Sequence, residues 1–262
     1  MSYETEISRT ILTRFTEGFE RCLQSHVIIV GAGPSGLVCA WKLAQRGFTV
    51  AILEKRLAPG GGLWGGGMGM GEVVMESEER PLLEELSVRY HSASRGELLV
   101  SHAAELASAL VFRAVGAGAF LLNLTFLEDL VVKGGAVRGA VVNRTMVGER
   151  LPVDPLTLDA RAVLDATGHE AVAAALLQRR GLLALSGRPQ GEGPMDARAA
   201  EAFVVERTGE VYPGLYLAGM SVCSALGGPR MGPIFGGMLR SGARAADLIT
   251  QALEASQKEE RA

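Results

Sequence analysis

Apolar residues are arranged in two patterns along this chain, helical spacing and short continuous runs, and the opening segment shows both. Apolar residues recur at helical spacing over residues 4–22, which predicts an amphipathic helix. A continuous apolar run at 26–30 predicts a buried strand, residues 37–46 a helix, and residues 48–53 a second strand. The chain is therefore expected to begin with a helix, a strand, a helix and a strand.

The alternation of strands and helices continues toward the other end of the chain. Further helices are expected at 78–90, 102–115, 170–180 and 233–255, and further strands at 120–123, 126–133, 137–145, 162–165 and 211–218. Gly134-Gly135 between two of these strands marks a hairpin turn. Residues 146–160 are predicted to form a loop, and residues 186–200, rich in Gly, Pro and Arg, a mobile connection.

Three glycines, Gly31, Gly33 and Gly36, stand between the first predicted strand and the helix that follows it. Such glycines permit a tight turn and let the helix N-terminus approach a pyrophosphate, whose charge favours the positive end of the helix dipole. Glu54 closes the second strand, where an acidic residue is expected to meet a ribose hydroxyl. Glycines alone also occur in ordinary strand–helix turns, but here strand, helix, second strand and acid coincide. The sequence therefore predicts a dinucleotide site.

These elements predict the α/β fold class: a doubly wound Rossmann-like FAD/NAD(P)-binding fold of the two-dinucleotide-binding-domain type, with a small inserted β region. Residues 1–262 are expected to form a single dinucleotide-binding α/β domain. Within it, residues 1–24 form an N-terminal helix, residues 119–160 approximately the inserted strands and a site loop, and residues 233–255 a closing helix.

Composition narrows the function classes. A net charge of −3 gives no electrostatic reason to expect nucleic acid or an anionic membrane as a partner. The polar start of the chain does not resemble a secretory signal, and no apolar stretch is long enough to span a bilayer. Cys22, Cys39 and Cys223 are scattered without metal-binding spacing. We therefore expect a soluble cytoplasmic protein with reduced thiols.

A glycine-dense loop at residues 59–68 contains Trp64 and Met68, which a flexible linker seldom carries, so its backbone is expected to pass close to a ligand. Together with Glu54 and a late Ala218-Gly219, this loop suggests a flavoprotein. Two features oppose that hypothesis: Met220 stands where an acid usually contacts the flavin ribityl chain, and the chain lacks room for the usual substrate domain.

Asp154 and His169 are candidate metal ligands, and the residues alone leave their roles open. Asp154 precedes Pro155, where it also suits a turn, and a single histidine often only packs. Arg230 precedes a glycine-rich helix start, where a planar guanidinium can clamp a carboxylate through two parallel hydrogen bonds. Surface arginines are common, so this role also needs further support.

Six segments of the chain resemble the thiamine thiazole synthases, specifically the archaeal and bacterial ADP-thiazole synthases. They are residues 6–9, 31–36, 59–68, 153–155, 167–169 and 230–238, and they extend from the first predicted helix to the last. The tryptophan-containing glycine loop and the Arg230-Met231-Gly232-Pro233 run are more specific than the dinucleotide pattern. The resemblance implies that NAD is consumed as a substrate: nicotinamide leaves, glycine condenses with the opened sugar, sulfide supplies sulfur, and an ADP-thiazole carboxylate forms.

The resemblance also implies roles for individual residues. Asp154 and His169 would bind Fe(II), with the aspartate reaching a neighbouring subunit of a homo-octamer, and Arg230 would hold glycine. Positions matching the family's nucleotide contacts are Gly31, Gly33, Ser35, Gly36, Glu54, Lys55, Gly62, Leu127, Pro152, Val153 and Met220. Packing alone would equally explain Leu127 and Met220.

One position departs from the family. Eukaryotic members carry a sulfur-donating cysteine two residues before the metal-binding aspartate and archaeal members usually a histidine, whereas this chain has Pro152. A single-turnover mechanism that consumes the protein's own thiol is therefore disfavoured, and free sulfide is the implied source. Cys223 is expected to pack rather than donate sulfur. An FAD-dependent oxidoreductase and a non-catalytic nucleotide-binding relative remain the alternative functions.

Overall fold

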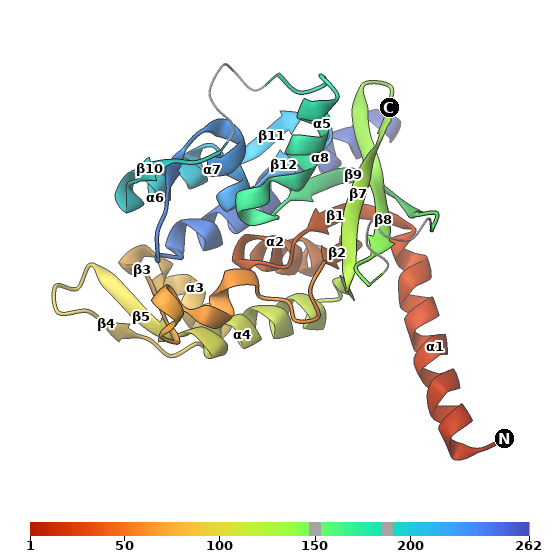
Figure 1. Ribbon diagram of the computed structural model, residues 1–262, viewed down its shortest axis with the longest axis horizontal. Coiled ribbons are helices and arrows are strands. Elements are labelled where there is room, and N and C mark those ends of the chain that lie inside the picture. The colour runs from red at the N-terminus through yellow and green to blue at the C-terminus, as the bar shows by residue number, and fades with distance from the viewer. Residues whose placement is uncertain (147–152, 185–190, 262) are drawn as a thin grey trace.

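A sheet of mainly parallel strands forms the centre of the computed structural model, which describes residues 1–146, 153–184 and 191–261 (Figure 1). Its order is β11-β12-β9-β1-β2-β6, and every neighbouring pair is parallel except β11 and β12. The strands are β1 (Gln24–Val30), β2 (Val50–Glu54), β6 (Phe120–Asn123), β9 (Leu156–Asp165), β11 (Gly209–Tyr212) and β12 (Leu215–Leu217). The strand order reverses at β1, so the predicted doubly wound α/β class is confirmed.

The two faces of the sheet bury separate hydrophobic cores because side chains of β1 alternate between them. Val27 and Ile29 join the core beneath α2 (Pro34–Gln45), α4 (Ala103–Gly116) and α8 (Gly236–Arg261). Ile28 and Val30 join the core on the other face, which also contains residues of α5 (Val172–Arg179) and α7 (Met220–Leu226). The run at 26–30 thus reads as continuously apolar because both faces are covered.

The predicted hairpin is present as β7 (Thr125–Lys133) and β8 (Ala136–Arg144), with both glycines of its turn at positive φ. Strand β8 continues by pairing antiparallel with the first residues of β9. The prediction of a loop at 146–160 was therefore wrong from Leu156 onward. Leu158 and Ala160 are buried between exposed neighbours, the alternation typical of a half-covered strand.

A small antiparallel sheet lies outside the predicted elements. It consists of β3 (Glu72–Glu76), β5 (Leu98–His102) and β4 (His91–Ser92) in that order. The predicted helix at 78–90 is shorter: a single 3-10 turn, η3 (Ser77–Glu79), leads into α3 (Arg80–Leu86). It stops at Ser87, whose φ of 58° is left-handed. The apolar spacing that suggested a longer helix continues beyond the end of α3, into the segment that leads to β4.

The C-terminal half contains elements that the apolar pattern did not predict. Residues 191–200 were expected to belong to a mobile connection, but they include β10 (Gly193–Met195) and the start of α6 (Ala197–Glu206), capped by Asp196. Strand β10 pairs with β13 (Pro229–Arg230). The single strand expected at 211–218 is instead the β11–β12 pair, because the chain turns at Pro213-Gly214.

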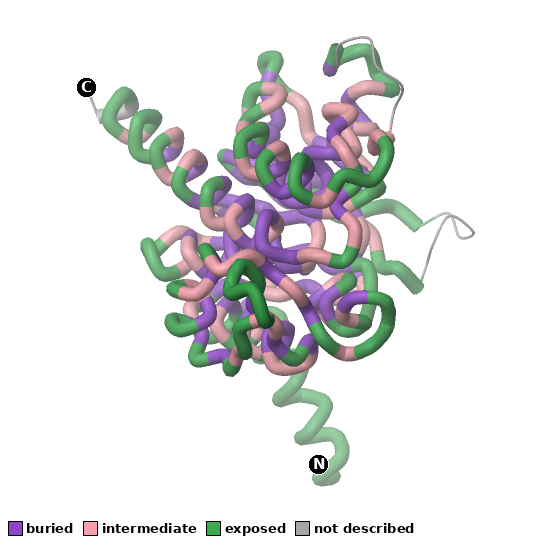
Figure 2. Tube along the Cα trace, turned by 90° about the vertical axis from the view of Figure 1, so that its left-hand side faces the viewer, coloured by how far each residue is buried: buried purple, intermediate pink, exposed green. Residues whose placement is uncertain are grey.

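Helix α1 (Tyr3–Cys22) projects from the body of the molecule and is exposed over most of its length (Figures 1 and 2). Ile11 is 64% exposed and Phe15 45%. Only its last turns contact the body, where Gly18 lies against the ring of Phe120. The predicted amphipathic helix is confirmed, but over most of the helix no other described part of the chain covers its apolar side chains.

A group of charged side chains lies between α8, α6 and the turn before α3, with Glu79 and Glu201 buried and Arg240 partly exposed. Arg240 Nε lies 2.7 Å from a carboxylate oxygen of Glu79, and Arg240 Nη2 lies 3.1 Å from Glu201 and 2.8 Å from Glu76. Glu78 also contacts Arg240. Burial raises the pKa of Glu79 to about 7; Arg240 opposes this shift, and the Glu201 carboxylate adds to it. Burial likewise raises the pKa of Glu201.

We expect this cluster to make stability depend on pH. Because the pKa of Glu79 rises from 4.5 in the unfolded chain to about 7, the native state binds more protons between those values, so the free energy of unfolding falls as pH rises through that window. Glu79→Gln removes this titration. From pH 5 to pH 8 the variant should gain on the order of 1–3 kcal/mol relative to wild type in urea titrations.

The matched control is Glu206→Gln, which changes an exposed carboxylate near the end of α6. It should leave the pH dependence of the free energy of unfolding unchanged. Parallel pH profiles for wild type and Glu79→Gln would contradict the assignment of the titration to Glu79.

Candidate active site

The turn between β1 and α2 has the close approaches that its glycines predict. Gly31 has a φ of 100°, and a Cβ there would lie 2.4 Å from the carbonyl oxygen of Ala166. A Cβ at Gly36 would lie 2.1 Å from the carbonyl oxygen of Gly31. At Gly33, by contrast, no atom of the described residues lies within 4 Å of the Cβ position. The first and third glycines are thus required by packing, whereas the second faces open space.

Glu54, at the end of β2, is oriented by this turn. Its carboxylate is buried and accepts the N–H of Ala32 at 3.1 Å and the N–H of Arg56 at 2.8 Å. Ser35 is also buried, in the first turn of α2, where its hydroxyl lies against Gly219. The structure therefore brings both predicted nucleotide contacts to the glycine turn.

The glycine-dense loop folds onto the same turn as two short 3-10 segments, η1 (Gly61–Gly65) and η2 (Gly67–Gly69). The N–H of Gly60 donates to the carbonyl of Ala32 at 2.7 Å, and a Cβ at Gly61 would lie 3.1 Å from Gly33 Cα. The indole N–H of Trp64 donates to the carbonyl of Pro59 at 2.6 Å. The loop that contains Gly62 therefore lies against the glycine turn, and the role of Gly62 stays a prediction.

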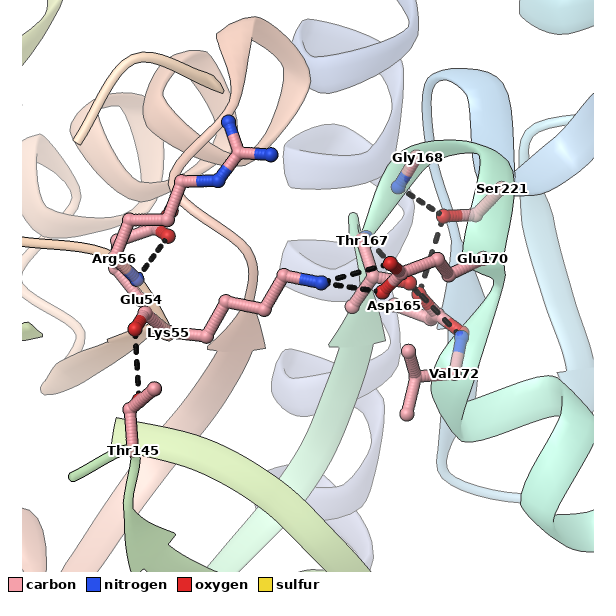
Figure 3. Close-up of polar contacts among 10 residues, drawn as sticks. All are labelled: Glu54, Lys55, Arg56, Thr145, Asp165, Thr167, Gly168, Glu170, Val172 and Ser221. Atoms are coloured by element: carbon pink, nitrogen blue, oxygen red, sulfur yellow. Dashed lines mark hydrogen bonds and ion pairs between the residues drawn. The ribbon is translucent and has the colours of Figure 1, made fainter. Parts of the chain in front are cut away.

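Lys55 extends from the end of β2 toward the segment that follows β9 (Figure 3). Its Nζ lies 2.6 and 2.8 Å from the two carboxylate oxygens of Glu170, and both side chains are about half exposed. The hydroxyl of Thr145 donates to the Lys55 carbonyl at 2.7 Å. The ion pair thus joins the carboxyl ends of two strands of the sheet, the edge where ligands bind in doubly wound folds.

Asp165 organises the turn that carries His169, and sequence reasoning did not single it out. One fully buried carboxylate oxygen accepts from the Thr167 N–H and hydroxyl and from the Ser221 hydroxyl (Figure 3). The other accepts from the N–H groups of Ala173 and Ala174 in the first turn of α5. Ser221 in turn accepts the N–H of Gly168 at 3.1 Å. The sequence signal available for Asp165 was an acidic residue at the end of an apolar strand, shortly before Thr167-Gly168.

His169 and Arg230 are attached to one short segment, residues 191–196. The Nδ1 atom of His169 contacts a carboxylate oxygen of Glu192. Two residues further on, β10 pairs with β13, and the Asp196 N–H donates to the Arg230 carbonyl at 3.1 Å. The side chains of His169 and Arg230 are both exposed. The structure thus places these two predicted residues on neighbouring segments, as a shared site requires.

Asp154 is not brought to His169 within this chain. It precedes β9, whereas His169 follows the last residue of that strand, and the two ends of β9 lie far apart in Figure 1. Asp154 is exposed, and the carbonyl of neighbouring Val153 accepts from the Asn143 amide at 3.2 Å. Pro152 lies outside the described residues. Leu127 and Met220 are both buried, in β7 and at the start of α7.

The thiols are buried and unreactive. Burial raises the pKa of Cys223 to about 12, with a smaller contribution from the Glu192 carboxylate, and raises the pKa of Cys22 to about 11. Burial raises the pKa of Cys39 as well. Because the thiolate is the nucleophilic form, none of the three is activated at neutral pH. The expectation that Cys223 packs agrees with its full burial.

Among residues 1–146, 153–184 and 191–261, no group of three or more His, Cys, Asp or Glu side chains is arranged to hold a metal ion. Within the same ranges, none of the helices has the length and apolar character needed to cross a membrane.

The doubly wound sheet, the glycine turn and the acid at the end of β2 define a protein of the Rossmann-like α/β class. The chain belongs to the Thi4 family, which it matches over residues 8–235. Its role is therefore in thiamine biosynthesis, and the resemblance inferred from sequence is confirmed.

Individual relatives agree with this assignment over almost the whole chain. The thiamine thiazole synthase of Thermotoga maritima is 46% identical over 248 residues, which cover 94% of this chain and 97% of the relative. That of Thermococcus kodakarensis is 49% identical over 253 residues, covering 95% and 98%. The crystal structure of Thermovibrio ammonificans THI4 superposes with a TM-score of 0.91 at 40% identity, covering 97% of this chain and 99% of that one.

Proposed function

We propose that this protein is a sulfide-dependent ADP-thiazole synthase, which converts NAD, glycine and sulfide into ADP-thiazole carboxylate and nicotinamide with Fe(II), over many turnovers. The observation that carries the proposal is that His169 and Arg230 both contact one segment, residues 191–196, in a Thi4-family chain. The whole chain of 262 residues acts as one dinucleotide-binding domain in this proposal.

NAD would bind along the carboxyl edge of the sheet. The N-terminus of α2 faces the diphosphate, with Ser35 beside it and open space at Gly33 for the phosphate oxygens. Glu54 keeps free lone pairs beyond its two backbone contacts, and these can accept from the ribose hydroxyls. The nucleotide contacts would be completed by six further residues: Lys55, Gly62, Leu127, Pro152, Val153 and Met220.

Glycine would bind through its carboxylate to Arg230. The Arg230 side chain is exposed, while the Arg230 backbone is held by the pairing of β13 with β10. The strand pairing therefore fixes the point from which the guanidinium extends. Two parallel N–H donors match the two oxygens of a carboxylate and fix the orientation of the amino group. The amino group is thereby directed at the sugar carbonyl with which it forms an imine, with loss of water.

The Fe(II) site would combine His169 of one subunit with Asp154 of a neighbour. At about 3.3 Å per residue, the ten residues of β9 separate its ends by roughly 20–30 Å, allowing for curvature. Ligand atoms of one metal ion lie only about 2 Å from it, so a single chain does not supply both ligands. An exposed imidazole and an exposed carboxylate are suitable donors for Fe(II).

Bound Fe(II) would supply open coordination positions for sulfide and substrate next to the reacting sugar. The homo-octamer implied by the family resemblance would bring Asp154 to the neighbouring site. The exposed apolar side chains of α1 favour such an assembly, because side chains such as Ile11 and Phe15 lie uncovered in the single chain.

Product formation should exceed one thiazole per subunit when purified protein is incubated anaerobically with NAD, glycine, sulfide and Fe(II). The reason is that position 152 holds no thiol and that Cys223 is fully buried with a pKa raised to about 12. Mass spectrometry of released product and of intact protein measures both turnover and any loss of sulfur from the chain. Cys223→Ser should still turn over repeatedly.

The same experiment separates the alternative functions. One equivalent of product with the loss of H2S from the protein would overturn the sulfide-dependent mechanism. A flavin absorbance spectrum in the purified protein, without an adenylated thiazole, would favour an oxidoreductase instead. Nucleotide binding with no product under any sulfide supply would favour a non-catalytic relative.

A further inference from the structure

We propose that Glu192 is a positioning residue: its carboxylate holds His169 in the orientation and tautomer that present Nε2 to the metal. The inference rests on the proposed role of His169 as a metal ligand, and it adds a residue that the sequence motifs did not single out. Three observations carry it, namely the contact itself, the unequal burial of its two partners, and the way the backbone on both sides of Glu192 is fastened.

The contact joins His169 Nδ1 to a carboxylate oxygen of Glu192. The side chain of Glu192 is only 12% exposed, whereas that of His169 is 64% exposed. The carboxylate is therefore the fixed partner, and the imidazole is the group that would otherwise rotate in solvent. A mostly buried carboxylate facing an exposed ring limits the ring to orientations in which Nδ1 points inward and Nε2 points outward.

The backbone around Glu192 is held on both sides. The N–H of Gly191 donates to the carbonyl of Ser224 at 3.3 Å, and the N–H of Gly193 donates to the carbonyl of Gly228 at 2.8 Å. The Ser224 hydroxyl donates in turn to the carbonyl of His169 at 2.7 Å. Glu192 and His169 are thus fastened to the same end of α7, which sets the distance between them.

This arrangement has a defined chemical effect on a metal ligand. When Nδ1–H donates to a carboxylate, the neutral imidazole keeps its lone pair on Nε2, and the carboxylate makes that nitrogen a better donor. The same segment continues into β10, which pairs with β13 and Arg230. Glu192 therefore also keeps the metal-binding nitrogen in register with the proposed glycine site.

The test measures Co(II) affinity by titration of the full-length assembled protein, alongside NAD affinity and the visible spectrum of the Co(II) form. Glu192→Ala should weaken Co(II) binding by about 10- to 100-fold, the usual effect of removing a partner of a metal-bound histidine. Glu192→Gln keeps an acceptor in the same place and should lose less. The saturated spectrum should match wild type, since the ligands are unchanged, and NAD affinity should stay the same.

His169→Ala and Glu206→Ala are the reference variants: the first should abolish Co(II) binding and the second should leave it intact. Loss of binding in His169→Ala with wild-type affinity in Glu192→Ala would overturn the inference and leave the metal site standing. Wild-type Co(II) affinity in His169→Ala would overturn both. An altered Co(II) spectrum in Glu192→Gln would make Glu192 a direct ligand, which also contradicts a positioning role.

Discussion

His169→Ala and Asp154→Ala are each expected to lower thiazole formation by more than about 100-fold, beyond what the loss of an outer partner of a metal ligand costs. Each substitution removes one of the two proposed protein ligands. Iron content measured after anaerobic loading should fall in parallel. NAD affinity should change little, because the glycine turn and Glu54 belong to β1, α2 and β2 and not to the segments that carry the ligands.

Mixing the two inactive variants in one octamer tests directly whether the two ligands come from different subunits. If Asp154 reaches the site of a neighbour, an octamer assembled from both variants contains some sites with an intact Asp154 and an intact His169. Random mixing in equal amounts restores about one quarter of the sites in a closed symmetric assembly. Co-expressed variants should therefore regain about that share of activity, whereas variants purified separately stay inactive.

Two outcomes would contradict the shared site. The absence of any recovery in verified mixed octamers would mean that both ligands come from one subunit. Unchanged iron binding and thiazole formation in both single variants would remove Asp154 and His169 from the metal site altogether.

Arg230→Ala is expected to reduce the use of glycine by about 10- to 150-fold, since a hydrogen-bonded contact to a charged group contributes about 1.5–3 kcal/mol. Arg230→Lys keeps the charge but loses the two parallel donors, so it should also fall well below wild type. The measurement is the dependence of thiazole formation on glycine concentration at saturating NAD and sulfide.

NAD affinity is the internal control for the Arg230 variants and should remain close to wild type. Raising the glycine concentration should partly recover the rate in Arg230→Lys, because the lost contact is one of binding. Glycine saturation at the wild-type concentration in both variants would mean that Arg230 only supports the start of α8.

The sequence predicted those parts of the fold whose signals are local and periodic. The run at 26–30, the turn at Gly31 and the hairpin at Gly134-Gly135 each combine an apolar pattern with residues that only one backbone conformation accommodates well. The small sheet of β3, β4 and β5 was missed because its strands are short and gain their cover from distant helices.

The candidate site likewise contains residues that local sequence signals predicted and residues that they did not. Glu54 and the glycine turn were recognisable because they follow one another closely along a strand–helix–strand unit. Ser221 and Glu192 were not, because each acts through a partner remote in sequence: Ser221 meets a loop 53 residues away, and Glu192 meets a histidine 23 residues away. Their identity follows from topology, which periodicity does not reveal.

Burial of the three cysteines lowers the reactivity of their thiols. With pKa values raised to about 11 at Cys22 and about 12 at Cys223, and raised also at Cys39, almost no thiolate exists at neutral pH. Oxidation, alkylation and persulfide formation all begin from an accessible thiolate. The three thiols are therefore poor competitors of free sulfide as nucleophiles at neutral pH.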